Sequence, residues 1–589
     1  MSKRDPHSYN DDAQPEVEEV AWRARVDFLA RVLEGEVVLT LRAPTSSAQP
    51  IDLDTRDLAI LSVSGDSGGR LPFSVGAPEP ILGSRLRIEL PAQARTVRIT
   101  YRTSPEASAL QWLSPAQTAG GRHPFLFSQC QAIHARSLLP IQDTPRLRIR
   151  YHAELTVPRA LRGLMAAAFR GREEKGELAV EKWEMPQPIP PYLIALAVGE
   201  LASRELGPRS AVWAEPEVVE RAAWEFAGVD QMVRAAEALF GPYDWERFDI
   251  LTMPPSFPYG GMENPRLTFL TPTLLAGDRS LVSVVAHELA HSWTGNLVSN
   301  ASAEHFWLNE GFTVFAERRI VEVIDGPEVC ALQAALGRRE LDRALGRFAA
   351  QPELTRLHTH LAGIDPDEAF SEIPYEKGFL FLRAIEEAAG RPAFDRFLRG
   401  YVERFRFRAI TTDDFCALAE ELLPGVLARI DAPAWLDKPG LPPGAPESRS
   451  TRLDAIRALG PTLPSEEIGR AFSPVEWQLY LEQLPHPPGG ELPAGLLAGL
   501  EARFHLTGSS NFEILVDWLE LATLGNFAPA LPRVEEVLGQ VGRMKYLRPL
   551  YQALCARSET RPLARRCFEK YQAGYHPIAR QVVEALLRG

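Results

Sequence analysis

The sequence predicts a multidomain α+β protein, in which an N-terminal β-sheet domain precedes a mainly α-helical domain and a C-terminal all-α domain. A chain of 589 residues is too long for one hydrophobic core, so three or four domains are expected. Charged residues make up 24% of the chain and hydrophobic residues 45%, which is typical of a globular protein. Along the chain, the spacing of apolar residues changes from two to between three and four, which marks a change from strands to helices.

The N-terminal third predicts strands. Residues 1–22 are polar and acidic, and we expect a disordered tail there. These residues contain no apolar run of the kind found in signal peptides. Nowhere in the sequence does an apolar run reach the ~18 residues of a membrane helix. From 23 to 206, alternating or β-branched segments are separated by turn residues, which predicts an antiparallel β-sheet domain. Its expected strands include 37–41, 95–101 and 147–152.

The remainder of the chain predicts helices. In 207–432, apolar residues recur at three-to-four spacing, and the expected helices cover 218–240, 281–297, 309–324 and 375–389. Residues 433–453 are rich in Pro and Gly, which indicates a linker. Short amphipathic helices fill 454–589, including 474–484, 511–522, 530–540, 547–557 and 578–587. Such a succession suggests a helical solenoid of the HEAT or armadillo type, although no clear repeat period is visible.

A metal-binding pattern lies in the middle domain. Residues 287–291 read His-Glu-Leu-Ala-His, and Glu310 follows within Trp-Leu-Asn-Glu-Gly-Phe. On a helix His287 and His291 are one turn plus about 40° apart, so both imidazoles can bind one Zn²⁺ at about 2.0–2.1 Å. Glu310 supplies a third ligand, and the fourth position stays open for water. Glu288 can accept a proton from that water, so we expect it to be the general base of a metalloprotease.

Further sequence blocks accompany this pattern in a fixed order. They are Ala-Leu-Gln-Trp-Leu at 109–113, Phe-Ser-Gln-Cys-Gln at 127–131, Pro-Pro-Ser-Phe-Pro-Tyr-Gly-Gly-Met-Glu-Asn-Pro at 254–265, His-Ser-Trp-Thr-Gly-Asn at 291–296, Tyr-Glu-Lys-Gly at 375–378 and Gly-Arg-Met-Lys at 542–545. Together they resemble the M1 family of zinc aminopeptidases, and within it the leukotriene A4 hydrolase-like branch with its bacterial and fungal members. The resemblance runs from about residue 26 to the C-terminus. It implies a thermolysin-like catalytic domain, one Zn²⁺ per chain, and removal of N-terminal residues from short peptides.

The resemblance also implies roles for individual residues. Tyr375 matches the tyrosine that stabilises the oxyanion, although alone it would be a core residue. Glu263 matches the carboxylate that holds the free ammonium group of the substrate. Gly260 and Gly261 let the backbone run beside the substrate, where a Cβ atom would intrude. Further substrate contacts are expected from Gln129, Gln131, Tyr259 and Met262.

Four further residues are candidates for the substrate site or for the surroundings of the metal. Arg543 and Lys545 match a block that holds the carboxylate of the substrate, although alone they would be a solvated charge pair. An enzyme that binds the amine at Glu263 and the carboxylate at Arg543 would favour short peptides. Asp367 matches an aspartate that favours N-terminal Arg and places water for epoxide opening, although alone it would be a turn residue. Glu317 could orient a zinc-bound histidine.

An alternative function stays open, in which the same cavity also hydrolyses a lipid epoxide such as leukotriene A4. Asp367, Arg543 and the zinc site favour it. Phe370 replaces a tyrosine that the epoxide alkylates in vertebrate members, and Ala303 replaces a tryptophan of their lipid pocket. Both differences leave the peptidase site intact. A third possibility, a scaffold that binds partners without catalysis, is opposed by the complete set of ligands and catalytic residues.

Composition limits the partners. The net charge of −13 argues against nucleic acid and is compatible with a cationic substrate. The five cysteines are scattered and odd in number, which indicates reduced thiols of a cytosolic protein. We therefore expect a cytoplasmic monomer with no nucleic-acid or membrane partner.

Overall fold

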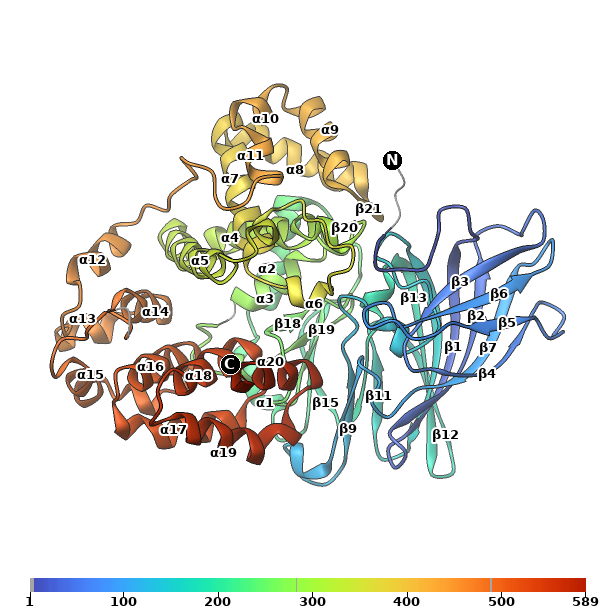
Figure 1. Cartoon of the computed structure of the whole chain (residues 1–589), viewed down its shortest axis with the longest axis horizontal. Helices are drawn as coiled ribbons and strands as arrows, with labels where there is room; N and C mark the ends of the chain where they lie inside the picture. The colour runs from blue at the N-terminus through green and yellow to red at the C-terminus, as the bar shows by residue number, and fades with distance from the viewer. Residues whose placement is uncertain (1–4, 282, 488–489, 589) are drawn as a thin grey trace.

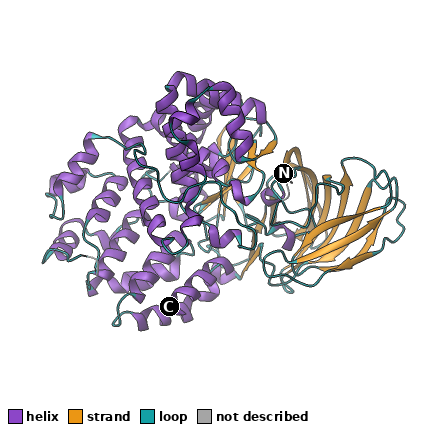
Figure 2. Cartoon of the chain, turned by 45° about the horizontal axis from the view of Figure 1, so that its top comes forward, coloured by secondary structure: helices purple, strands orange, loops and turns teal. Residues whose placement is uncertain are grey.

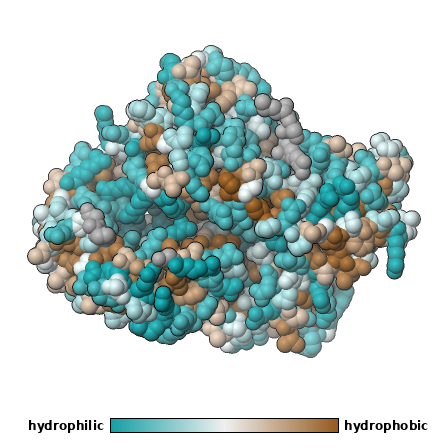
Figure 3. Space-filling model, viewed as in Figure 1, coloured by the Kyte–Doolittle hydropathy of each residue, from teal (hydrophilic) through white to brown (hydrophobic). Residues whose placement is uncertain are grey.

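The computed structural model describes residues 5–281, 283–487 and 490–588. Strands gather at one end of the molecule and helices at the other (Figure 2). The chain passes from a sheet-rich N-terminal part, through a mainly helical middle part, to C-terminal helices that curve beneath the middle part (Figure 1). Between these two helical parts, the face seen in Figure 3 is hollowed. This arrangement confirms the predicted multidomain α+β fold.

Three sheets form the N-terminal part. Their strands are β1 (Val17–Asp27), β2 (Val32–Leu41), β3 (Gln49–Thr55), β4 (Ala59–Ser64), β5 (Phe73–Val75), β6 (Ser84–Leu90), β7 (Thr96–Arg102), β8 (Leu110–Leu113), β9 (Phe125–Ser128), β10 (Ile149–Pro158), β11 (Arg162–Met165), β12 (Ala168–Lys175), β13 (Leu178–Ile189) and β14 (Leu196–Gly199). The orders are β12-β13-β10-β1-β2-β7-β4, β3-β6-β5 and β11-β14-β9-β8. The expected antiparallel pairing needs one correction, because β1 and β10 run parallel. A long connection through other strands separates them, which is what parallel neighbours require.

The N-terminal segment departs from the predicted disordered tail. β1 begins inside the predicted tail, and residues 5–16 pack against the protein, with Asp5, His7, Ser8 and Asn10 buried. Ser8 Oγ donates to Asp54 at 2.6 Å, and His7 Nε2 lies 3.1 Å from the Leu361 carbonyl. Composition predicts disorder for a segment that cannot bury apolar surface, but this segment is held by hydrogen bonds to distant partners. Residues 1–4 lie outside the described part of the chain.

The middle part combines a small mixed sheet with helices. The sheet has the order β15-β16-β17-β19-β18, with bounds Ala202–Gly207, Ser210–Ala214, Asp249–Thr252, Leu267–Leu270 and Gly261–Met262 in that order. The helices are α1 (Val219–Glu225), α2 (Val229–Phe240), α3 (Ser283–Ala290), α4 (Trp307–Asp325), α5 (Pro327–Arg347), α6 (Pro366–Ala369), the π-helical turn η7 (Ile373–Lys377), α7 (Gly378–Ala389), α8 (Arg391–Phe405), α9 (Thr412–Leu422), α10 (Val426–Arg429) and α11 (Ala432–Leu436). A short parallel pair joins β20 (Val298–Asn300) to β21 (Arg408–Ile410).

Two predicted helices of the middle part differ in the structure, because one is split and the other ends early. The expected helix at 218–240 is split at residues 226–228 into α1 and α2. The expected helix at 281–297 ends at Ala290, and His291 follows in a turn. Gly295, with φ +107°, has a backbone conformation that does not continue a helix. After this early end the chain turns back toward α3, and the Asn296 N–H donates to the His291 carbonyl at 2.7 Å.

The C-terminal part is a two-layered helical array. Its helices are α12 (Thr451–Leu459), α13 (Glu466–Ala471), α14 (Pro474–Gln483), α15 (Leu496–Phe504), α16 (Phe512–Leu524), α17 (Leu531–Gln540), α18 (Met544–Cys555), α19 (Arg561–Tyr571) and α20 (Pro577–Arg588). The even-numbered helices pack in series, and α13 with α15 and α17 with α19 form the second layer. This is the predicted solenoid-like stacking, although the sequence did not reveal α12, α13, α15 or α19. None of the helices in the described residues is long and apolar enough to cross a membrane.

Two of the contacts between the C-terminal part and the middle part involve α5 and residues 542–544. Helix α5 packs against α12 and α14, and Arg343 on α5 forms an ion pair with Glu482 at 3.0 Å. In the second contact, the Gly542 N–H donates to the Pro255 carbonyl at 2.7 Å, and the Met544 N–H donates to the Pro258 carbonyl at 2.9 Å. The second contact holds residues 542–544 beside the loop that leads into the Gly-Gly-Met-Glu-Asn segment.

Candidate metal centre and substrate site

The three residues of the expected metal site converge in the middle part. His287 lies on α3, His291 follows α3, and Glu310 lies in the first turn of α4. The Nε2 atoms of His287 and His291 are 3.4 Å and 3.5 Å from Glu310 Oε2. Potential ligand atoms of all three residues lie within 4.8 Å of one another.

These separations suit a zinc ion. Four ligands in a tetrahedron at 2.0–2.1 Å from Zn²⁺ would be about 3.3–3.4 Å apart, close to the separations from Glu310 Oε2 to both imidazoles. Glu310 Oε2 is buried and accepts no hydrogen bond from the described residues. Burial would raise the pKa of Glu310, but the imidazoles of His291 and His287 outweigh it and lower this pKa to about 2. The carboxylate is therefore kept in the anionic, metal-binding form.

Neighbouring groups orient both imidazoles. His287 Nδ1 lies 3.0 Å from Glu317 Oε2 on α4, and His291 Nδ1 lies 3.1 Å from the Thr294 carbonyl. Both acceptors favour a proton on Nδ1, which leaves each Nε2 lone pair free for a metal. The sequence suggested Glu317 for this role. It did not suggest Thr294, whose carbonyl reaches His291 only because α3 ends at Ala290.

Glu288 lies beside the ligands and faces Gly261 on β18. It is 5% exposed, and burial is the main cause that raises the pKa of its carboxyl group to about 7. A Cβ atom on Gly261 would lie 2.2 Å from Glu288 Oε1. The absence of a side chain at Gly261 is therefore what makes room for the Glu288 carboxylate.

Tyr375 completes this side of the site. Its ring stacks on the ring of His287, with centroids 6.1 Å apart. Burial, followed by the nearby Glu310 carboxylate, raises the pKa of Tyr375 well above its usual value, so its hydroxyl keeps its proton. The π-helical turn that carries it is held by an ion pair of 2.6 Å between Glu376 and Arg318 on α4. The sequence analysis did not single out this ion pair.

Glu263 also lies beside the ligands, with the Gln131 side chain next to it. Gln131 Nε2 donates to Glu263 Oε1 at 3.3 Å, and Glu263 is 4% exposed. Glu263, Glu288 and His291 also bring potential ligand atoms within 4.8 Å of one another. Gln129 Nε2 contacts Met262 Sδ at 3.2 Å, and Gln129 Oε1 is buried without a hydrogen-bond partner among the described residues. The structure thus brings these four predicted substrate residues together beside the metal ligands.

Arg543 reaches this region from the C-terminal part. A Cβ atom on Gly260 would lie 2.7 Å from Arg543 Nη2, so the guanidinium lies against the Gly-Gly segment. Arg543 Nη1 donates to Glu513 Oε1 at 3.0 Å and to the Tyr546 hydroxyl at 2.6 Å. Lys545 Nζ forms an ion pair with the other oxygen of Glu513 at 3.0 Å. Glu513 therefore offsets part of the positive charge, and no sequence pattern predicted this role.

Asp367 lies on α6 and contacts the N-terminal part. Its Oδ2 is 2.9 Å from His134 Nε2. Burial would raise the pKa of Asp367, but His134 and Arg56 outweigh it and lower the pKa below its usual value. No local pattern marks His134, although it stands only three residues after the Phe-Ser-Gln-Cys-Gln block.

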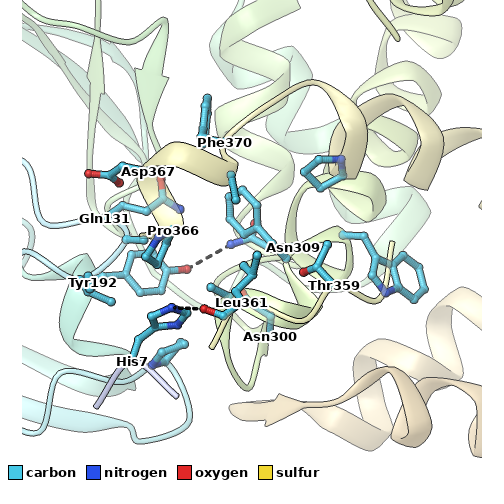
Figure 4. A pocket seen from close by; sticks show the side chains of 18 of the residues that line it. His7, Gln131, Tyr192, Asn300, Asn309, Thr359, Leu361, Pro366, Asp367 and Phe370 are labelled. Atoms are coloured by element: carbon cyan, nitrogen blue, oxygen red, sulfur yellow. Dashed lines mark hydrogen bonds between the residues drawn. The ribbon is translucent and has the colours of Figure 1, made fainter. Parts of the chain in front are cut away.

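A largely apolar pocket adjoins these residues. In Figure 4, Asp367, Gln131, Tyr192 and Asn309 lie around it, and the Tyr192 hydroxyl and Asn309 side chain are joined by a hydrogen bond of 3.3 Å. His7 closes another side, through the bond to Leu361 that Figure 4 also shows. Its other lining residues include Tyr259, Ala303, Phe306, Trp307, Leu354, Leu357 and Phe370. Ala303 and Phe370, the two positions at which a departure from vertebrate members was expected, thus both face this space.

Three family models match the chain. The peptidase M1 N-terminal domain matches residues 5–193, the peptidase family M1 domain matches 224–431, and the leukotriene A4 hydrolase C-terminal domain matches 472–587. The chain is similar to leukotriene A-4 hydrolase of Xenopus laevis, with 38% identity across 98% of both proteins. It is also similar to leucine aminopeptidase 2 of Yarrowia lipolytica, with 39% identity across 95% of this chain and 90% of the relative.

Solved structures give the same picture. Yeast LTA4 hydrolase in complex with bestatin superposes with a TM-score of 0.92 and 34% identity, and covers 100% of this chain and 97% of the yeast chain. An M1 zinc metallopeptidase of Deinococcus radiodurans, at 22% identity and a TM-score of 0.60 over 76% of this chain, shows the fold alone.

Proposed function

The chain belongs to the M1 family of zinc aminopeptidases, and on that premise we propose that it removes the N-terminal residue from short peptides by means of the residues around His287, His291 and Glu310. Family membership was predicted from the sequence blocks and is confirmed by the family models and relatives. It implies one zinc ion per chain, which the His-His-Glu cluster suits. The observation that carries the proposal concerns the buried Glu310 Oε2. Its distances to the Nε2 atoms of both imidazoles are those expected between two ligand atoms of one zinc ion.

Glu288 and Tyr375 would perform the chemistry of this chain. When bound, zinc would polarise the scissile carbonyl group and acidify a water molecule. Glu288, with a pKa raised to about 7 chiefly by burial, would accept a proton and deliver it to the leaving amine. Tyr375, which keeps its hydroxyl proton, would donate a hydrogen bond to the oxyanion.

Glu263 would bind the ammonium group of the substrate. Its carboxylate lies beside the metal ligands, and Gln131 offers a second polar group at 3.3 Å. A charge-assisted hydrogen bond of this kind selects peptides with a free N-terminus. Gly260, Gly261, Met262 and Tyr259 would form the edge along which the peptide backbone lies, with Gln129 behind Met262.

Arg543 and Lys545 would bind the carboxylate at the other end of a short peptide. Arg543 Nη2 faces Gly260, and no described residue accepts a hydrogen bond from it, whereas Nη1 is held by Glu513 and Tyr546. A guanidinium that is fixed at one nitrogen and free at another can bind an incoming carboxylate in a defined orientation. The distance between Glu263 and Arg543 would then limit the length of a good substrate.

A second activity, hydrolysis of a lipid epoxide, is favoured by one observation. The cavity beside Asp367 is apolar over most of its lining, so a hydrocarbon chain could occupy it. The Xenopus relative is named for leukotriene A-4. Incubating the enzyme with an epoxide of a polyunsaturated fatty acid, and measuring diol formation with and without a chelator, tests this activity. No diol above the uncatalysed rate would exclude it for that epoxide.

We also propose that the enzyme works in the cytoplasm as a monomer. All five cysteines are free, as expected of a protein from a reducing compartment. Sedimentation at micromolar concentration would test the monomeric state, and a dimer mass would contradict it.

The aminopeptidase proposal is tested with matched peptides. We expect a free tripeptide to be hydrolysed and its N-acetylated form to resist hydrolysis, because Glu263 would face a neutral amide. A Glu263→Gln variant should hydrolyse the free tripeptide more slowly, which ties the effect to this carboxylate. Equal turnover of free and acetylated peptides by the wild-type enzyme would contradict the proposal.

A further inference from the structure

His134 belongs to the N-terminal part and bonds Asp367, which belongs to the middle part. The two side chains meet at 2.9 Å between His134 Nε2 and Asp367 Oδ2. His134 is 8% exposed, whereas 29% of the Asp367 side chain remains exposed. Among the described residues, none donates a hydrogen bond to Asp367 Oδ1. One carboxylate oxygen is therefore held, and the other is free on a residue that lines the cavity.

The other ring nitrogen of His134 determines which proton form is present. Arg56 Nη1 lies 3.1 Å from His134 Nδ1, and the Ser108 hydroxyl lies 2.8 Å from it. A guanidinium can only donate, so Nδ1 must be the acceptor. The single ring proton then lies on Nε2 and is donated to Asp367. These contacts also prevent the ring from turning, because Arg56 Nη2 is itself held by the Ile81 carbonyl at 2.5 Å.

The same short segment also supplies a residue to the amine side of the site. Gln131 donates to Glu263, and His134 follows three residues later in a turn closed by its own N–H bond to the Cys130 carbonyl at 2.8 Å. One turn of the N-terminal part therefore contacts both Glu263 and Asp367. Since both carboxylates are contacted from this one turn, a substrate whose ammonium group binds Glu263 can extend its first side chain toward Asp367.

We propose that His134 is a positioning residue, which holds Asp367 so that its free oxygen binds a cationic side chain, such as Arg or Lys, on the N-terminal residue of the substrate. The proposal rests on the proposed aminopeptidase function and on the substrate-binding role of Asp367. His134 itself does not contact the substrate. It acts by giving the Asp367 carboxylate one orientation before the substrate binds, which reduces the entropy lost on binding.

Two polar substitutions of His134 distinguish the loss of its hydrogen bond to Asp367 from a general change in polarity at this position. In His134→Gln, the amide nitrogen can take the place of Nε2 and still donate to Asp367. In His134→Asn, the shorter amide can replace only Nδ1, so the bond to Asp367 is lost. The measured quantity is the ratio of kcat/KM for Arg-Gly-Gly to that for Leu-Gly-Gly, with separate KM and kcat. Zinc content and the thermal unfolding midpoint are measured for each variant.

We expect the ratio to fall about tenfold in His134→Asn, mainly through KM for Arg-Gly-Gly, because a hydrogen bond to a charged group is lost. His134→Gln should keep most of the ratio. Asp367→Asn should lower it at least as far, and adding His134→Asn to Asp367→Asn should change it little further, since both act through one carboxylate. His152→Asn, an exposed histidine of β10 that pairs with Glu19, serves as the control and should keep the wild-type ratio.

A wild-type ratio in His134→Asn, together with a reduced ratio in Asp367→Asn, would overturn the positioning role. An unchanged ratio in Asp367→Asn would also overturn the inference, because Asp367 would then bind no cation. Neither result touches the aminopeptidase proposal, which is tested separately by the hydrolysis of free and N-acetylated tripeptides by the wild-type enzyme.

Discussion

Replacing Gly261 by alanine should disable the general base without touching the metal ligands. The added Cβ atom would lie 2.2 Å from Glu288 Oε1, 2.4 Å from its Cδ and 2.6 Å from its Cγ. Ordinary contacts of a Cβ atom are 3.4–4 Å. Gly261 has no positive φ value, so the backbone itself accepts alanine. The strain therefore falls on the Glu288 side chain, which must move by about 1 Å to restore an ordinary contact distance.

A displacement of this size has a calculable consequence. Misplacing a catalytic group by ~1 Å costs about 10²-fold in rate, which corresponds to roughly 2.7 kcal/mol in the activation free energy. We expect kcat for a free tripeptide to fall by about this factor. The zinc content should stay at one per chain, because His287, His291 and Glu310 keep their positions. KM should change less than kcat, because Glu288 acts on the reacting bond.

Its neighbour Gly260 provides a matched control. The same substitution there places the Cβ atom 2.7 Å from Arg543 Nη2, and its three nearest atoms all belong to Arg543. Gly260→Ala should therefore reduce the preference for peptide acids over peptide amides and leave kcat for a single-residue chromogenic amide less affected than in Gly261→Ala. The assay is steady-state hydrolysis of both substrate types by both variants, with zinc measured by elemental analysis. If Gly261→Ala retains wild-type kcat with zinc bound, the placement of Glu288 as the base is refuted.

Three further predictions follow from the same geometry. Removing the metal with a chelator should abolish peptidase activity. Glu310→Gln should lower the zinc content of purified protein, because a neutral amide binds zinc more weakly than the carboxylate that lies 3.4 Å and 3.5 Å from the two imidazoles; full zinc occupancy in Glu310→Gln would contradict the ligand assignment. Glu288→Gln should keep zinc while kcat falls at least ~10²-fold, and Tyr375→Phe should also lower kcat; wild-type turnover in Glu288→Gln would remove the base from the mechanism. Arg543→Ala should erase the preference for tripeptide acids over their C-terminal amides, a loss of roughly 1.5–3 kcal/mol in binding free energy; an unchanged acid-to-amide ratio would show that Arg543 binds no carboxylate.

Elements that depend on residues close together in the chain could be predicted from the sequence. The zinc motif predicted helices around His287 and Glu310, and α3 and α4 carry both. The change of apolar spacing near residue 207 predicted that helices follow, but it missed the strands β16 to β19, which continue beyond this point as part of a mixed sheet. The blocks that carry the family resemblance placed Glu263, Gln131 and Arg543 in one site, although Arg543 is far away in the chain.

Features that depend on distant partners could not be predicted in this way. The parallel pairing of β1 with β10 leaves no trace in either strand, since both alternate as antiparallel strands do. Residues 5–16 look disordered by composition and become ordered only through partners such as Asp54. His134 and Glu513 are single polar residues with no local pattern, and their roles depend on Asp367 and Arg543, which meet them only in the fold.

The bonds that join residues 542–544 to the loop at 255–258 involve only backbone atoms on both sides. Every amino acid except proline offers the same N–H group, so most substitutions along this joint leave it intact. Gly542 is the exception, because a Cβ atom there would lie 2.7 Å from Ser256 Cα. The amide hydrogens of Gly542 and Met544 can exchange with solvent deuterium only when the C-terminal helices separate from this loop. Their exchange rates would therefore report directly how often the two parts of the enzyme open.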